Sequence, residues 1–129
     1  MNREIWEFLV KGNDGVIQRW FRDETISKRE QAKLDVALNR LRTLDLQLIG
    51  GKLLAGPLHG SKIYKLRLRC ENRELRPMLC RGPIAPAEEY TLLQGALEVG
   101  DKLKPHDAVD RAASHREELL ANPDWRAPF

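Results

Sequence analysis

Basic residues alternate along 63–69, IYKLRLR, and this stretch is the best candidate for chemistry in the chain. In an extended chain, Lys65, Arg67 and Arg69 point to one side and the residues between them point to the other. Like charges on one face of a strand repel each other. Phosphate oxygens would relieve that repulsion and match the bidentate geometry of arginine. The alternative is a charged edge strand that resists aggregation, and the sequence leaves both interpretations open.

A hairpin would extend this basic face. Seven cations fall within 20 residues, namely Lys62, Lys65, Arg67, Arg69, Arg73, Arg76 and Arg81. With a two-residue turn at 71–72, residues whose numbers add to 143 lie opposite each other. The expected pairs are Lys65 with Met78, Arg67 with Arg76, Arg69 with Glu74 and Cys70 with Arg73. This register separates Cys70 from Cys80, so we expect no disulfide and interpret both as small core or strand-end residues.

Composition bounds the class of protein that carries this face. The chain has 129 residues and is 42% hydrophobic, which predicts a single domain over 1–129 with one core. The net charge is +3, a mild excess that indicates a polyanionic partner only where the cations are concentrated. Two cysteines are too few for a disulfide scaffold or a zinc site. The N-terminus does not resemble a signal peptide, and no apolar run has the length of a membrane helix, so we expect a cytoplasmic protein with no membrane partner.

The first half of the chain predicts one strand and two helices. Asn13 or Asp14 is suited to cap the first helix. Ser27 and Glu30 have the spacing of a capping box, which opens a second and longer helix. The apolar face of that helix comprises Leu34, Ala37, Leu38, Leu41, Leu44 and Leu48. The expected elements are a strand at 5–10, a turn at 12–15, a helix in GVIQRWFR and a helix from about 28 to 44.

The second half predicts a sheet and a last helix. The expected order is a hairpin from SKIYKLRLRC and LRPMLC, a loop RGPIAPAEE and a central strand YTLLQGALEV. A last helix follows, with Pro105 in its first turn, and then a C-terminal tail ANPDWRAPF. The apolar stripe of that helix comprises Val109, Ala112, Ala113 and Leu120. Strands and helices are clustered along the chain, which is typical of an α+β fold. We therefore expect a small antiparallel sheet, with the helix 28–44 on one face and the basic hairpin on the other.

Four motifs follow one another in a characteristic order. They are IYKLR, LRPMLC, LLQGALE and KLKPHDAVDRA, and VIQRWF precedes them in the first expected helix. In this order they resemble the RelE/ParE superfamily of type II toxin–antitoxin toxins, and most closely its phage-derived, HigB-like branch. The resemblance covers about residues 5–120 and implies the RelE-like order β-α-α-β-β-β-α.

The resemblance also implies an activity. Many RelE-like and HigB-like toxins are ribosome-dependent mRNA endonucleases that need no metal or other cofactor, because the 2′-hydroxyl of the substrate attacks its own phosphate. Lys65, Arg67 and Arg76 match the basic positions of the family's strands and are the expected catalytic residues. Arg69, Lys102 and Lys104 are expected to bind RNA. The implied partners are a cognate antitoxin, typically a small helix-turn-helix protein, together with the ribosome and mRNA.

The sequence departs from the family at two places, and these keep other functions open. Residues 98–101, EVGD, are acidic where the family often has Lys or Arg, and no Tyr follows in the last helix. A ParE-like member would act on gyrase or another protein target and cleave nothing. An inactive relic would only bind its antitoxin. Fold carries over from a resemblance more safely than activity does.

Histidines and tryptophan offer further candidates. His59, just before the basic strand, would serve as a general base or bind RNA, or is an ordinary loop residue. His106 and Asp110 have i, i+4 spacing on the expected last helix, but two ligands are a weak metal signal and we expect no metal site. His115 is expected to be exposed, and Trp125 to stack on a base or cover a helix end.

Overall fold

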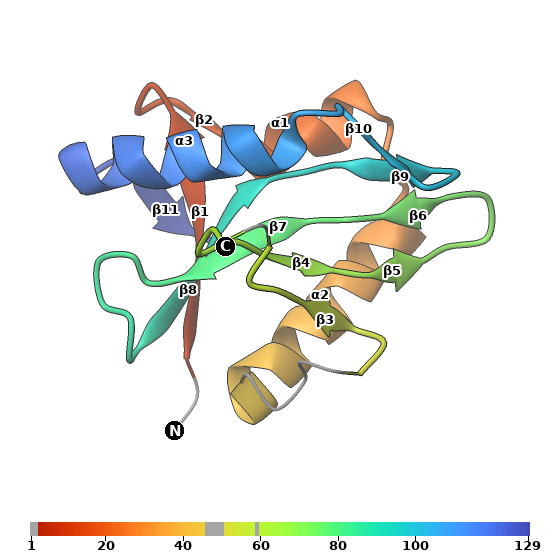
Figure 1. Cartoon of the computed structure of the whole chain (residues 1–129), viewed down its shortest axis with the longest axis horizontal. Coiled ribbons are helices and arrows are strands. Elements are labelled where there is room, and N and C mark those ends of the chain that lie inside the picture. The colour runs from red at the N-terminus through yellow and green to blue at the C-terminus, as the bar shows by residue number, and fades with distance from the viewer. Residues whose placement is uncertain (1–2, 46–50, 59) are drawn as a thin grey trace.

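The computed structural model describes residues 3–45, 51–58 and 60–129, which form an α+β fold with helices on both faces of a sheet (Figure 1). The helices in these ranges are α1 (Val16–Asp23), α2 (Lys28–Leu44) and α3 (Ala108–Ala121). The strands are β1 (Glu4–Val10), β2 (Asp14–Gly15), β3 (Leu54–Ala55), β4 (Tyr64–Leu66), β5 (Leu68–Arg69), β6 (Glu74–Leu75), β7 (Met78–Arg81), β8 (Glu89–Gln94), β9 (Leu97–Val99), β10 (Lys102–Lys104) and β11 (Arg126–Pro128). None of the helices in the described ranges is both long enough and apolar enough to cross a membrane.

The strands form two ladders that continue into each other. One has the order β11-β1-β8-β7-β4-β3, with β2 paired to β1, and the other has the order β10-β9-β6-β5. The segments β4 and β5, β6 and β7, and β8 and β9 each follow one line of chain, so the second ladder extends the first (Figure 1). The hairpin with the basic face therefore lies within the sheet. The expectation that this hairpin lies on the face of the sheet opposite α2 is therefore wrong.

The sheet is mixed, and the expectation of a wholly antiparallel sheet is wrong for β1. This strand runs parallel to β8, with Ile5 beside Tyr90. Parallel neighbours need a long crossover connection, and here α1, α2 and the strands β3 to β7 lie between them in the sequence. The expectation for YTLLQGALEV is confirmed, because β8 lies between β1 and β7 and residues 90–93 are buried. Gly95 and Ala96 separate β8 from β9.

The long helix forms as its sequence predicts. Ser27 Oγ accepts a hydrogen bond from Glu30 N (3.1 Å), and Glu30 Oε1 accepts one from Ser27 N (2.9 Å), which completes the capping box. Leu34, Ala37, Leu38 and Leu41 are buried along one face of α2, while Leu44 is exposed and position 48 lies outside the described residues. In Figure 1, α2 lies behind β4 and β5, and α3 lies in front of the sheet.

The first helix is capped from a distant strand. Neither Asn13 nor Asp14 caps α1, and the preceding residue is Gly15. The carboxylate of Glu7, on β1, instead accepts hydrogen bonds from Ile17 N (2.9 Å) and Gln18 N (3.0 Å). Burial raises the pKa of Glu7. A side chain at Gly15 would place its Cβ 2.4 Å from a Glu7 carboxylate oxygen, so glycine is required for this cap.

The C-terminal region differs from expectation in three ways. Pro105 precedes the helix, because α3 begins at Ala108. Its buried stripe includes Ala108, Ala112 and Leu119, whereas Leu120 is exposed. The tail forms strand β11, which pairs with β1. The indole ring of Trp125 packs beside Gly12 in the turn after β1 and against the hydrophobic core.

Candidate functional site

The predicted hairpin register is confirmed. The observed partners are Lys65 with Met78, Leu68 with Leu75 and Arg69 with Glu74, and the backbone hydrogen bonds Leu66 N to Pro77 O and Cys70 N to Arg73 O are each 2.9 Å long. Arg67 accordingly lies across from Arg76. Cys70 and Cys80 are both buried and free, as expected, and burial raises the pKa of Cys80 to about 12.

Arg76 and Lys65 converge on Glu98, which is not among the site residues predicted from the sequence. Arg76 is only 5% exposed, and its Nη2 atom lies 3.1 Å from Glu98 Oε2 and 3.4 Å from Glu74 Oε2. Lys65 Nζ lies 3.7 Å from Glu98 Oε1. We call these four residues, Lys65, Glu74, Arg76 and Glu98, the charged cluster.

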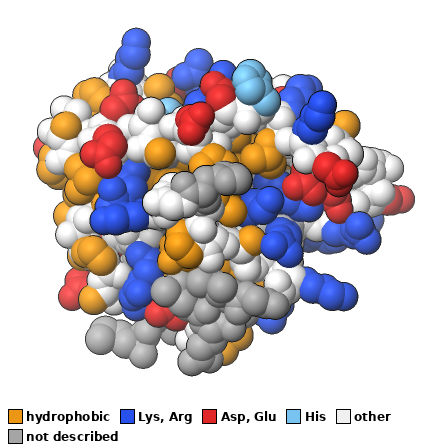
Figure 2. Space-filling view, in the orientation of Figure 1, with side chains coloured by type: hydrophobic (Ala, Val, Ile, Leu, Met, Phe, Trp, Pro, Cys, Tyr) orange, Lys and Arg blue, Asp and Glu red, His pale blue; other side chains and the backbone are white. Residues whose placement is uncertain are grey.

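Sheet pairing explains why the cluster forms. Glu98 on β9 pairs with Glu74 on β6, so two carboxylates lie directly opposite each other. Such a pair is unfavourable unless a cation lies near both. Arg76 follows β6 and supplies that cation, while a buried guanidinium in turn requires ionic partners. Figure 2 shows acidic side chains over β6 and β9, with Lys and Arg side chains around them.

Two more cations lie on the neighbouring strand and face solvent. Arg67 and Arg69 are exposed, and the Arg69 side chain, 87% exposed, contacts Glu74 Oε1 through Nη2 at 3.1 Å. Arg67 makes no ion pair with any carboxylate in the described ranges. The Lys65 and Glu98 side chains are 20% and 22% exposed, so both are reachable from the same side of the sheet.

Lys102 and Lys104 do not join the charged cluster. On β10, it is Leu103 that pairs with Glu98, so the two lysines that flank it point to the opposite face. Both lysines are exposed. His59 lies outside the described residues, so its expected contact with RNA is not placed.

Arg73 has a structural position that removes it from the expected cation cluster. Its guanidinium donates hydrogen bonds to both carboxylate oxygens of Glu30 (2.8 and 2.9 Å), to Glu24 O (2.9 Å) and to Thr25 O (3.0 Å). It therefore joins the end of α1 to the start of α2. The hydrogen bonds from Arg73 lower the pKa of Glu30 to about 2.

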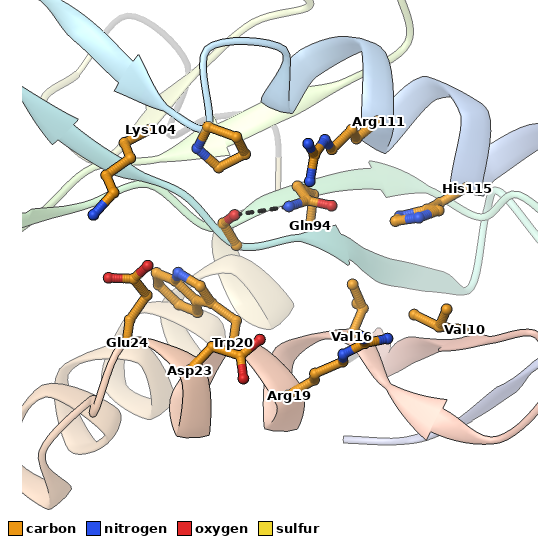
Figure 3. Close-up of a pocket in the computed structure, with 12 residues that line it drawn as sticks. Val10, Val16, Arg19, Trp20, Asp23, Glu24, Gln94, Lys104, Arg111 and His115 are labelled. Atoms are coloured by element: carbon orange, nitrogen blue, oxygen red, sulfur yellow. Dashed lines mark hydrogen bonds between the residues drawn. The ribbon is translucent and has the colours of Figure 1, made fainter.

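A separate cavity lies where the sheet has a gap. Its lining includes Arg19 and Trp20 from α1, Gln94 and Lys104 from the sheet, and Arg111 and His115 from α3 (Figure 3). The volume is about 410 Å³. The gap exists because β1 pairs with β8 only as far as Leu92, whereas β10 pairs with β9 from Leu97 onward.

His115 is partly buried in this cavity, contrary to the expectation that it is exposed. Its Nδ1 lies 2.7 Å from Leu93 O. A carbonyl only accepts, so Nδ1 carries the proton and, in the neutral ring, Nε2 is left as an acceptor. The ring also stacks on Phe8, with centroids 4.7 Å apart.

The expected histidine–aspartate pair on the last helix is not formed. His106 precedes α3, so it has no i, i+4 helical relation to Asp110. The carboxylate of Asp107 accepts no capping hydrogen bond and instead pairs with Arg111, which lowers the pKa of Asp107. Within the described ranges, no three His, Cys, Asp or Glu side chains gather in a way that could hold a metal ion.

The chain, with this mixed α+β fold and this charged cluster, matches no protein family, no curated protein and no solved structure at a significant level.

Proposed function

We propose that this protein is the toxin of a type II toxin–antitoxin pair and cleaves mRNA on the ribosome without a metal. The observation that carries the proposal is the Glu98 carboxylate, which is held between Lys65 Nζ and Arg76 Nη2 at 3.7 and 3.1 Å. The resemblance of the sequence motifs to RelE-like and HigB-like toxins supports the same assignment. The cognate antitoxin would be a small helix-turn-helix protein.

The charged cluster has the groups that such a cleavage needs. The substrate 2′-hydroxyl loses its proton to the Glu98 carboxylate as its oxygen attacks the adjacent phosphorus. The bond from phosphorus to the 5′-oxygen breaks, and Lys65 donates a proton to that leaving oxygen. The products are a 2′,3′-cyclic phosphate and a free 5′-hydroxyl. Glu98 and Lys65 suit these roles because they are partly exposed side by side.

Cations around the cluster would hold the phosphate. Arg76 is fixed by two carboxylates, so its guanidinium is already oriented when the negative charge of the transition state develops. Arg67 lies across from it and faces solvent, where it would bind a non-bridging phosphate oxygen. Arg69 would steer the RNA backbone along the strand. Lys102 and Lys104, on the other face, would contact only RNA that passes around the edge of the sheet.

Substitution within the cluster tests the proposal. Lys65→Ala and Glu98→Gln should each lower cleavage of a message by about a hundredfold or more, because each removes a group that acts in the transition state. The control is Lys28→Ala, which removes an exposed cation from α2. Growth after induction and mRNA integrity are the measurements, with circular dichroism to verify folding. If the folded variants remain as toxic as the parent, the cluster is not the active site.

The ion pairs within the cluster favour a second candidate function. Lys65 and Arg76 are both neutralised by glutamates of the chain itself, which suits a protein that binds its partners without cleaving RNA. Such a protein would act on gyrase or another protein target, or would only bind its antitoxin. Growth arrest with intact message indicates a protein target. Absence of both arrest and cleavage indicates an inactive, antitoxin-binding relic.

A further inference from the structure

A groove between α2 and β5 carries charges of one sign only. Its rim consists of Arg29, Lys33, Arg40, Arg67 and Arg69. The rest of its lining, which we call the floor, is aliphatic and comprises Ala32, Val36, Ala37, Leu53 and Leu68. The groove has a volume of about 430 Å³, and its described lining contains no carboxylate and no aromatic ring.

Val36 is a large apolar residue that this groove leaves exposed. On α2 it lies between Lys33, one turn before it, and Arg40, one turn after it, and it is 62% exposed. The apolar residues of the opposite face of this helix are buried. Arg29 and Arg40 have no carboxylate partner within 4.0 Å in the described part of the chain. An apolar strip rimmed by cations, several of which have no carboxylate partner in the described residues, is best covered by a ligand that offers both aliphatic side chains and negative charge.

The lining favours a protein over RNA as that ligand. Single-stranded nucleic acids bind grooves in which aromatic side chains stack on their bases, and the described lining offers none. Alanine, valine and leucine side chains instead form a floor that accommodates leucine or isoleucine of a partner. Acidic residues at the flanks of such a segment would meet the rim cations.

The exposed edge of β5 determines the conformation of the partner. Strand addition requires free backbone groups along the edge. Here Arg69 O already accepts a hydrogen bond from Lys33 Nζ (2.6 Å), and Arg67 N donates to Leu53 O (2.8 Å). A helical partner does not need these backbone groups, because its own N–H and C=O groups form hydrogen bonds within the helix. The rim from Arg29 to Arg40 is about 16 Å long at 1.5 Å per residue, which equals about three turns of a docked helix.

We propose that the α2–β5 groove docks an acidic amphipathic helix of a protein partner. The helix lays its aliphatic face on Val36 and its acidic flanks on the rim. It engages Arg67 and Arg69, so the docked helix and an RNA backbone compete for the same strand. This consequence for RNA rests on the proposed function, whereas the docking itself does not.

A synthetic peptide tests the docking directly. The probe is a fluorescein-labelled helix of about 14 residues, with leucines on one face and glutamates on both flanks, and its anisotropy is followed during titration with the full chain. A scrambled peptide of the same composition lacks the amphipathic face. We expect the designed peptide to bind in the micromolar range, more weakly at high salt, and the scrambled one to bind at least about tenfold more weakly.

Matched variants locate the binding site. Arg29→Glu/Arg40→Glu reverses two rim charges, and Arg22→Glu/Lys28→Glu reverses two exposed charges outside the groove. The first variant should lose about tenfold or more in affinity, and the second should change by less than about threefold. Val36→Asn should also weaken binding. Equal effects of the two double variants, or no effect of Val36→Asn, would refute the proposal.

Two further measurements separate this proposal from the proposed function. Competition by a ribo-oligonucleotide through Arg67 and Arg69 is expected, but an oligonucleotide that loses as much affinity as the peptide in Arg29→Glu/Arg40→Glu would overturn the docking assignment. Peptide binding by a chain that cleaves no RNA would support the docking and count against the catalytic function alone. If the chain cleaves RNA, the bound peptide should inhibit cleavage, and the rim variant should resist that inhibition.

Discussion

Replacing Arg73 by alanine should destabilise the protein far more than replacing any exposed cation of the hairpin. The guanidinium of Arg73 joins α1 to α2 through four hydrogen bonds, two of them to Glu30. The pKa of Glu30 falls from 4.5 to about 2, which corresponds to about 3 kcal/mol before solvent screening. Glu30 lies near the surface, so we take about 1–2 kcal/mol for the pair and about 1 kcal/mol for the two carbonyl contacts. The expected loss is therefore about 2–3 kcal/mol.

Urea unfolding followed by tryptophan fluorescence measures this loss. Arg69→Ala is the control, because its side chain is 87% exposed and, among the described residues, makes polar contacts only with Glu74. That substitution should cost less than about 0.5 kcal/mol. A double-mutant cycle of Arg73→Ala with Glu30→Gln isolates the pair and should give a coupling of about 1–2 kcal/mol. Equal stability of Arg73→Ala and Arg69→Ala would refute the structural role assigned to Arg73.

Three other outcomes follow from the contacts. The pKa of Glu30 is depressed, so the stability that its carboxylate contributes is complete above about pH 4.5 and is lost as the pH falls through about 2. Over that range the parent should lose more stability than Arg73→Ala does, as measurements of the unfolding free energy at a series of acid pH values would show. Gly95→Ala should lower the melting temperature by several degrees, because the added Cβ would lie 2.1 Å from the Trp20 ring. Cys80, with its pKa raised to about 12, should resist thiol reagents at pH 8 until the protein is unfolded, as a spectrophotometric thiol assay would detect.

The elements that sequence predicts well are those determined by neighbouring residues. The capping box at Ser27 and Glu30 depends on residues three apart. The hairpin register depends on the length of one turn, and the turn at 71–72 aligns Arg69 with Glu74 as expected. Local chemistry of this kind leaves few alternatives, so a single sequence is sufficient to predict it.

Contacts between distant segments account for the differences. Glu7 caps α1 in place of Asn13 or Asp14, because β1 brings its carboxylate to the helix start and Gly15 leaves room for it. The tail at 126–128 becomes β11 because β1 would otherwise be an open edge of the sheet. The residues that neighbour Glu7 and the C-terminal tail in the sequence indicate neither of these long-range contacts.

The candidate site combines both kinds of contact. Arg67 and Arg76 are the same residue type and face each other across the hairpin, yet Arg67 is exposed and Arg76 is buried. The difference arises from strand order, since β5 is an edge strand and β6 lies between β5 and β9. A cation next to an inner strand must find carboxylates in that sheet, and β9 supplies Glu98.

The acidic residues after β8 therefore acquire a role that the resemblance of the sequence motifs to RelE-like toxins does not indicate. A lysine or arginine at Glu98 would place a third cation against Lys65 and Arg76, and the buried guanidinium would keep only Glu74 as its partner. With glutamate there, the same three positions form a carboxylate flanked by two cations, which is an arrangement that can both accept a proton and stabilise a phosphate. The departure from the family pattern is thus the feature on which the proposed chemistry depends, and Glu98→Gln separates it from a purely structural ion pair. If the carboxylate only anchors Arg76, glutamine will lower stability and leave the cleavage rate per folded molecule unchanged.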